Sequence, residues 1–254
     1  MSGYVLADQP SVLGGGSSAT IWEGETTELR YLVRSNRNQP GSFRYTINGP
    51  SMTAAGYVDV DAQDQTSISI QTPVLSLGDH DYQITLIDTA ASPDSTLWMA
   101  TSTVFVVDYT TSPAIEPVFD PEVLSSPFSL TYPPLPKPTV LRIPKSPDKS
   151  QVTISWWVRI TNVNPNNAGK IFEALPDSGR VSGSSGEEVT ASVDIFNSNA
   201  VPFGEINRFE LIVIAPSGDT LGIAGSAIAT DSLGTPSVTS TEESSWSELK
   251  SLFR

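Results

Sequence analysis

The stretch TTSPAIEPVFDPEVLSSPFSLTYPPLPKPTVLRIPKSPDKS, residues 110–150, divides the chain into two parts. It contains 10 of the 20 prolines in a sequence of 254 residues. Each proline fixes φ, has no N–H to donate and pushes the preceding residue toward extended geometry. We therefore predict neither a helix nor a central strand here. Over residues 132–138 we predict a semi-rigid, polyproline-like spacer.

On either side of this stretch, apolar and polar residues alternate in short runs separated by Gly, Asn and Asp. The clearest runs lie at 27–34, 42–48, 66–72, 81–88, 151–161 and 188–196. A period of two over many short runs is typical of half-buried antiparallel strands. We therefore predict an all-β protein with two immunoglobulin-like antiparallel sandwiches, at 21–109 and 151–231, joined by a Pro-rich linker at 110–150.

The alternation also assigns side chains to the two cores. In the first sandwich the core faces are predicted to carry Leu29, Tyr31, Val33, Phe43, Tyr45, Ile47, Ile68, Ile70, Tyr82, Ile84 and Leu86. In the second they carry Val152, Ile154, Trp156, Val158, Ile160, Val189, Ala191, Val193 and Ile195, while Trp157 lies on the opposite face. The almost continuously apolar run 209–215 predicts a strand covered on both sides. The small residues of 221–229 (Gly222, Ala224, Gly225, Ala227) predict that another segment packs closely there.

Two terminal segments flank the sandwiches. Residues 1–20 form a predicted N-terminal arm with a flexible hinge at 14–18, and this arm is either a frayed end or a segment that orders on a neighbouring subunit. Residues 232–254 comprise a polar linker and a C-terminal amphipathic helix. The apolar stripe of that helix, our candidate partner-binding site, consists of Trp246, Leu249, Leu252 and Phe253. So short a helix needs a surface, which is either its own second sandwich or a groove on a partner.

Composition excludes several classes of function. The formal net charge is −14, and so acidic a surface repels phosphate backbones, which argues against nucleic-acid binding. The absence of cysteine rules out a disulfide, a zinc–thiolate site and a thiol nucleophile. No apolar run approaches the length that spans a bilayer, and we expect no secretory signal in the first residues, which lack a basic start and an apolar core.

The sequence contains little that points to catalysis. His80 is the only histidine, and its neighbours Asp79 and Asp81 are expected to point away from it along a strand. No nucleophile is placed for it to activate. We therefore predict a non-enzymatic protein that uses no cofactor.

We also predict no metal site, and the candidates that we weighed are Asp59, Asp61 and Asp64. Three carboxylates in a short loop resemble a calcium-binding arrangement. The run lacks the glycine and the distal glutamate of an EF-hand loop, so a polar hairpin end is the alternative interpretation.

Two stretches resemble a known family. The run GEEVTASVDIFN at 186–197, followed by the strand at 209–214 and by Pro216-Ser217-Gly218, resembles the CARDB-type immunoglobulin-like modules of bacteria and archaea. In those modules a Gly-Glu turn leads into a strand ending in Asn, and a Pro-x-Gly hairpin follows. GDHDYQITL at 78–86 is similar to a late strand of the same family. The resemblance implies a sandwich fold and a role as a spacer, adhesive or assembly unit, although a fold alone fixes no function.

These features together predict a structural or assembly protein. The version that we favour is a virion component, a capsid decoration or tail-associated protein, that is made in the host cytoplasm and bound to capsid or tail subunits or to further copies of itself. A cell-surface adhesive or spacer protein is one alternative. A carbohydrate-binding accessory module is another, and Trp157 on an exposed sheet face would be its glycan contact.

Overall fold

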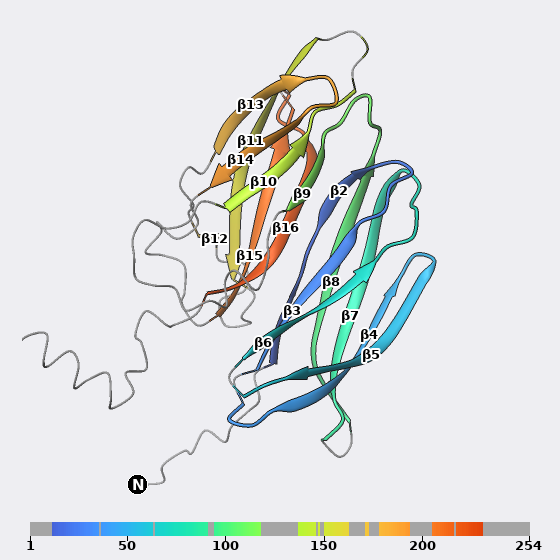
Figure 1. Cartoon of the computed structure of the whole chain (residues 1–254), viewed down its shortest axis with the longest axis vertical. Coiled ribbons are helices and arrows are strands. Elements are labelled where there is room, and N and C mark those ends of the chain that lie inside the picture. The colour runs from blue at the N-terminus through green and yellow to red at the C-terminus, as the bar shows by residue number, and fades with distance from the viewer. Residues whose placement is uncertain are drawn as a thin grey trace, which may run out of the picture.

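The computed structural model of the chain is all-β, as predicted (Figure 1). It describes residues 12–35, 37–62, 64–90, 94–117, 137–145, 147, 150–162, 171–172, 178–193, 205–215 and 217–230. Within these ranges the chain forms sixteen strands and no helix. Accordingly, this part of the chain has no helix long and apolar enough to cross a membrane.

The first sandwich consists of eight strands in two sheets. They are β1 (Val12–Gly16), β2 (Ala19–Trp22), β3 (Glu28–Ser35), β4 (Gly41–Gly49), β5 (Met52–Val60), β6 (Gln65–Gln71), β7 (Gly78–Asp88) and β8 (Ser95–Val107). The order β1-β3-β6 makes one sheet, and β2-β8-β7-β4-β5 makes the other. The predicted core is confirmed, because Leu29, Tyr31 and Val33 meet Phe43, Ile47, Tyr82, Ile84 and Leu86 in one buried cluster.

The second sandwich also consists of eight strands. They are β9 (Ala114–Pro117), β10 (Lys137–Arg142), β11 (Gln151–Asn162), β12 (Ile171–Phe172), β13 (Ser178–Ser184), β14 (Glu188–Val193), β15 (Glu205–Ile214) and β16 (Thr220–Thr230). β9, β10 and β14 form one layer, and β11 pairs with β12, β13 and β15 in the other, which β16 completes. Ile154, Trp156 and Val158 lie in the second core, as the alternation predicted.

The two sandwiches share one connectivity. Leaving out β2 and β12, each has seven strands, of which the first, second and fifth form one sheet. The other sheet runs fourth-third-sixth-seventh, which is β5-β4-β7-β8 in the first sandwich and β13-β11-β15-β16 in the second. This strand order, in which the chain passes back and forth between two sheets, is that of an immunoglobulin-like sandwich.

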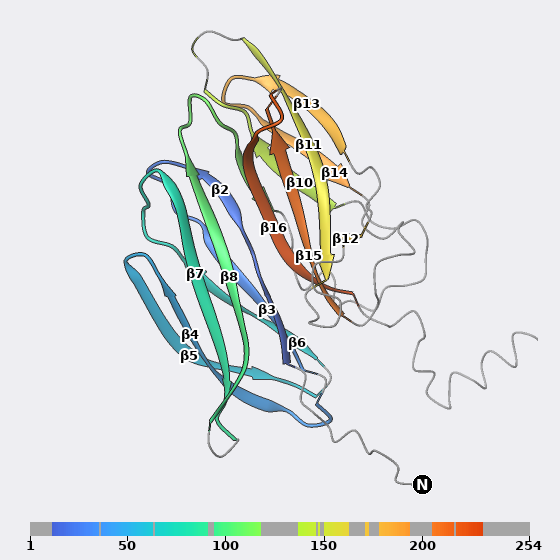
Figure 2. The ribbon, with the colours of Figure 1, turned by 180° about the vertical axis from the view of Figure 1, so that it is seen from behind.

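One sheet runs through both sandwiches without a break. Its eight strands follow the order β14-β10-β9-β2-β8-β7-β4-β5, and the two halves join where Thr20 of β2 pairs with Ile115 of β9. The β2–β8 pair is parallel, an exception to the antiparallel pairing that we predicted. Figures 1 and 2 show the second sandwich lying along the first, with β16 facing β2 and β3. The two sandwiches are therefore in direct contact and are not held apart by a linker.

The prediction that residues 110–150 contain no central strand is wrong. β9 and β10 are interior strands of the eight-stranded sheet, and Ile115, Leu141 and Ile143 are fully buried in the second core. The prolines permit this because Pro117 and Pro138 lie at or next to strand ends, where a missing N–H costs little. Most of the spacer predicted at 132–138 lies outside the described residues.

The flexible hinge predicted at residues 14–18 is also wrong. Gly14 to Gly16 belong to β1, which pairs antiparallel with β3, and Ser17 and Ser18 are buried. A Cβ atom on Gly16 would lie 2.2 Å from the Ser102 hydroxyl oxygen and 3.1 Å from the Tyr31 ring. The glycine at this position therefore permits close packing rather than mobility.

The strand predicted at 209–215 is covered on both faces, as expected. Leu211 and Val213 of β15 point into the second core, while Ile212, on the opposite face, is only 2% exposed. Leu32 of β3, which the alternation had grouped with polar residues, is 3% exposed although it lies outside the first core. β15 and β16 lie against β1 and β3. We conclude that Ile212 and Leu32 are buried between the two sandwiches.

Candidate functional site

The contact between the two sandwiches is the most elaborate polar site in the described part of the chain. It is built on residues 12–22, which we call the crossing segment. β1, at its start, pairs with β3, and β2, at its end, pairs with β8. Between them Ser18 makes an isolated bridge to Gly225 of β16, with N–H···O distances of 2.7 and 2.8 Å. The crossing segment thereby joins all three sheets.

Thr20 makes the second link to β16. Its hydroxyl donates to the carbonyl of Ile223 at 2.8 Å and accepts the Ile223 N–H at 2.9 Å. Thr20 is fully buried, so these bonds are shielded from water. A Cβ on Gly222 would lie 2.9 Å from the Thr20 hydroxyl and 3.2 Å from Ile115. The close approach predicted from the small residues of this strand is confirmed, and the crossing segment is what approaches.

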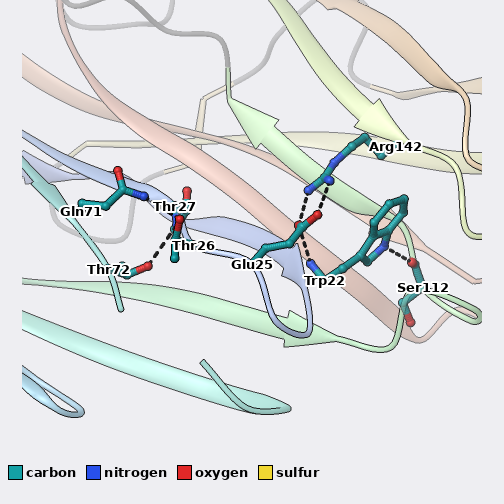
Figure 3. Close-up of polar contacts among 8 residues, drawn as sticks. All are labelled: Trp22, Glu25, Thr26, Thr27, Gln71, Thr72, Ser112 and Arg142. Atoms are coloured by element: carbon teal, nitrogen blue, oxygen red, sulfur yellow. Dashed lines mark hydrogen bonds and ion pairs between the residues drawn. The ribbon is translucent and has the colours of Figure 1, made fainter. Parts of the chain in front are cut away.

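Trp22 closes the end of the junction (Figure 3). Its indole N–H donates to the carbonyl of Ser112 at 3.0 Å, and the side chain is only 5% exposed. The guanidinium carbon of Arg142 lies 4.5 Å from the centre of the ring, and the Lys145 ammonium lies 5.0 Å away. Cations over an indole face are attracted by its quadrupole, so one ring from the first sandwich holds two cations from the second.

An ion pair joins the same two parts of the chain. The two terminal guanidinium nitrogens of Arg142, Nη1 and Nη2, donate to the carboxylate of Glu25 at 2.6 Å, a bidentate arrangement. The backbone N–H of Trp22 donates to the same carboxylate at 3.1 Å (Figure 3). The hydrogen bond from Arg142 lowers the pKa of Glu25, burial opposes this, and the Trp22 N–H and the charges of Arg142 and Lys145 add to the lowering. Glu25 is therefore a carboxylate at neutral pH.

This arrangement binds one sandwich to the other. Its buried hydroxyls, those of Ser17, Ser18 and Thr20, are hydrogen-bonded to backbone groups. The site orients the two cores through buried hydrogen bonds, a planar ion pair and an aromatic ring. Its chemistry is that of an internal interface.

Most of the junction was not predicted from the sequence. Glu25 and Arg142 lie 117 positions apart, and Arg142 falls in the stretch that we predicted to be a linker. Trp22 had no assigned role. A bidentate pair across such a separation leaves no local pattern, and the single available signal was the set of small residues on β16, which indicates a close neighbour without naming it.

His80 lies on β7 and its ring Nε2 is 2.7 Å from the carbonyl oxygen of Ser76. Neither adjacent carboxylate contacts the ring by a hydrogen bond that the structure describes, and Asp81 instead accepts the Thr103 hydroxyl at 2.7 Å. The ring of His80 is thus held by a local backbone carbonyl, and no described hydrogen bond orients it as a catalytic base.

The three candidate metal ligands do not converge. Asp59 lies on β5, while Asp61 and Asp64 lie in the connection to β6, and all three are exposed. The Asp64 carboxylate accepts the N–H of Gln65 at 2.8 Å. In the part of the chain that the structure describes, no group of three or more His, Asp or Glu side chains is placed to hold a metal ion.

The tryptophans of β11 lie as the alternation predicted. Trp156 is in the core and 4% exposed. Trp157, on the opposite face, is partly buried, with the guanidinium carbon of Arg159 5.9 Å from its ring centre. Trp246, Leu249, Leu252 and Phe253, the predicted partner-binding stripe, lie outside the described residues, as does the whole of 231–254.

No model of a known protein family matches this chain, and no curated protein matches it. Among solved structures the chain is similar to the CARDB domain of a Pyrococcus furiosus protein, crystallised in complex with di-metal ions. The two have 13% sequence identity and a TM-score of 0.33, over 39% of this chain and 94% of that domain. CARDB is also the family that the sequence pattern resembles. The immunoglobulin-like assignment itself is supported by the strand order described above.

Proposed function

We propose that this chain is a non-enzymatic structural protein that holds two immunoglobulin-like sandwiches as one rigid unit and presents their surfaces to partners. The observation that carries the proposal is the junction, in which one sheet runs through both sandwiches and buried bonds from Ser18 and Thr20 fasten β16 to the crossing segment. Relative motion of domains is the default unless their interface is extensive. Here backbone pairing, buried hydrogen bonds and the buried side chains Leu32 and Ile212 all lie between the two sandwiches. A continuous sheet instead fixes the distance and angle between the two ends of the molecule.

A fixed geometry suits a protein whose function is contact. The two sandwiches need no ordering relative to each other when the protein binds, so that part of the entropic cost of binding is avoided. No residue of the junction is arranged to turn over a substrate. We therefore favour assembly over catalysis, and the partners would be structural proteins rather than small molecules.

The specific form that we propose is a virion component, a capsid decoration or tail-associated protein made in the host cytoplasm. Its partners would be capsid or tail subunits. The absence of cysteine suits assembly in a reducing compartment, and the net charge of −14 favours solubility before assembly. Attachment would use the stripe Trp246, Leu249, Leu252 and Phe253, because tryptophan and large apolar side chains dominate binding interfaces.

The experiment is particle incorporation in a density gradient with the full-length chain and two variants. Replacing Trp246, Leu249 and Phe253 together by serine should reduce the fraction that sediments with particles at least about tenfold. The matched control, Ser247→Ala with Ser251→Ala, changes the same segment off the stripe and should incorporate normally. Unchanged incorporation of the stripe variant would refute the attachment site, and absence of the unaltered protein from particles would refute the virion role.

A cell-surface spacer is the second candidate, since the rigid junction would serve an extended spacer equally well. Surface exposure on intact cells, detected by protease accessibility, separates it from a virion component. Glycan binding is the remaining alternative, and it requires Trp157→Ala to abolish retention on a glycan array. The partial burial of Trp157 disfavours this alternative.

A further inference from the structure

The eight-stranded sheet ends at β5, and no described strand pairs with the outer edge of this strand. β5 is nine residues long, with the sequence MTAAGYVDV. It has no proline and no lysine, and its single charge is Asp59. Tyr57 is 66% exposed on its outward face. Edge strands of this length are ordinarily protected by charge, proline or a covering element, because their free N–H and C=O groups can pair with another chain.

The other sheet edges of the molecule differ from β5. The edge of β16 is covered by the bridge from Ser18. The opposite end of the long sheet, β14, begins at the exposed Glu188 and has no aromatic residue. β6 is also free of charge, but it is shorter and its exposed residues are polar, Ser67, Ser69 and Gln71. Of the edges at β5, β6, β14 and β16, β5 alone combines an unprotected backbone with an aromatic side chain that is exposed, Tyr57.

We propose that β5 is a self-association edge, and that two copies of this chain pair their β5 strands antiparallel about a two-fold axis at Gly56. Opposite residues in this register are Ala55 with Tyr57 of the second copy, and Thr53 with Asp59. Each exposed tyrosine ring then covers a small alanine across the strands, a pairing that removes apolar surface from water. The long sheets of the two copies become one.

The position of Asp59 favours the antiparallel over the parallel pairing of two copies. In a parallel, in-register pair the two Asp59 carboxylates would lie directly opposite each other, which is unfavourable. In the antiparallel pair they lie six residues apart along the ribbon, roughly 20 Å at about 3.3 Å per residue. That separation exceeds the Debye length of about 8 Å at physiological ionic strength, so the acidic ends do not repel strongly. Isologous pairing about a two-fold axis is also the commonest way in which chains form dimers.

This inference goes beyond the proposed function and does not depend on the virion role. The test is analytical ultracentrifugation of the full-length protein over a concentration series at physiological salt. We expect a monomer–dimer equilibrium. The double variant Ala55→Glu/Tyr57→Glu places carboxylates opposite each other at both contacts and should raise the dissociation constant at least about 100-fold. Thr101→Glu, an exposed position on β8 of the same sheet, is the control for added charge and should dimerise normally.

A charge-swap experiment guards against misfolding of the variant. Ala55→Lys/Tyr57→Lys should also be monomeric alone, and mixing it with the glutamate variant should restore dimers, because the register brings the two changed positions together. A wild-type protein that remains monomeric at every concentration would overturn the proposal. So would a mixture that fails to form heterodimers while both variants unfold like the wild type. If the glutamate variant lost particle incorporation although the wild type formed no dimer, the edge of β5 would pair with a strand of a different protein. That result would likewise overturn the proposal.

Discussion

The two sandwiches have the same connectivity but differ in their last strands. β8, in the first, is rich in β-branched and aromatic residues, and the crossing segment of its own sandwich lies alongside it. β16, in the second, has the sequence TLGIAGSAIAT, and it receives Ser18 and Thr20 from the first sandwich. The crossing segment therefore pairs with the last strand of the first sandwich and forms hydrogen bonds with the last strand of the second.

The glycines of β16 show how closely the crossing segment approaches the second sandwich. Glycine in a strand interior is unfavourable by roughly 0.5–1 kcal/mol relative to alanine, so its presence needs a compensating contact. At Gly222 the compensation is visible, since the Thr20 side chain occupies the space of a Cβ atom. The second sandwich thus gives up intrinsic strand stability for a close contact with the first.

The largest expected effect comes from filling that space. Gly222→Leu should push the crossing segment away from β16 and lower the unfolding free energy by about 3 kcal/mol, as overpacking does in tight interiors. Denaturant unfolding measures the loss, and it should also show two transitions in place of one if the sandwiches uncouple.

The matched substitution on the counterpart strand is Thr101→Leu, at an exposed position of β8. It should change stability by no more than about 0.5 kcal/mol. Equal losses of stability from the two leucine variants would show that the close contact of Thr20 with Gly222 does not distinguish β16 from β8.

The ion pairs of the two regions provide the next contrast. Arg142→Ala leaves the Glu25 carboxylate without its guanidinium and should cost about 2 kcal/mol, less than for a fully buried pair because Glu25 is one-third exposed. Arg44→Ala removes the exposed pair with Asp94, whose closest atoms are 3.2 Å apart, and should cost less than about 0.5 kcal/mol. Both are read from denaturant midpoints at neutral pH.

A double-mutant cycle between Arg142→Ala and Glu25→Gln isolates the pair from the cation–π contact with Trp22. A coupling energy of about 1 kcal/mol or more is expected, since the bonds are bidentate and charge-assisted. Additive losses would mean that Arg142 acts through the Trp22 ring and not through the carboxylate.

The alternation of side chains predicted much of this architecture. It correctly separated Trp156 from Trp157 and put Tyr31 and Tyr82 in the first core, because a strand that buries one face imposes its period on the sequence. The almost continuously apolar run 209–215 identified β15 as a strand covered on both faces. These are local signals, in which each residue reports the environment of its own strand.

The proline content led to a wrong prediction at β9 and β10, where local and tertiary effects conflict. Residues 114–116 and 139–142 are short intervals without proline, and they are long enough to pair in a sheet once neighbouring strands supply the partners. Their pairing partners, such as Glu116 with Val140, are set by the tertiary fold. The same holds for Glu25 and Arg142, since nothing near either residue in the sequence indicates the other.

The smallest expected effect is on the pH dependence of the unfolding free energy. It should differ between Glu25 at the junction and Glu28 on the surface of the first sandwich. The hydrogen bond from Arg142 lowers the pKa of Glu25 from its ordinary value of 4.5. A carboxyl group whose pKa is lower in the folded state contributes stability that is complete above the unfolded pKa and is lost as pH falls through the folded one. The stability difference between wild type and Glu25→Gln should hold down to about pH 5 and shrink below about pH 4.5.

Glu28 provides the comparison for this titration. The hydrogen bond from Arg30 lowers its pKa as well, but both side chains are about 40% exposed, so the solvent screens the pair and little stability is linked to it. Thermal unfolding of Glu28→Gln should therefore track the wild type across the acidic range, whereas Glu25→Gln converges on it. If the two variants gave parallel curves, Glu25 would be no better shielded than a surface carboxylate, and the junction would contribute packing and backbone hydrogen bonds but no electrostatic link.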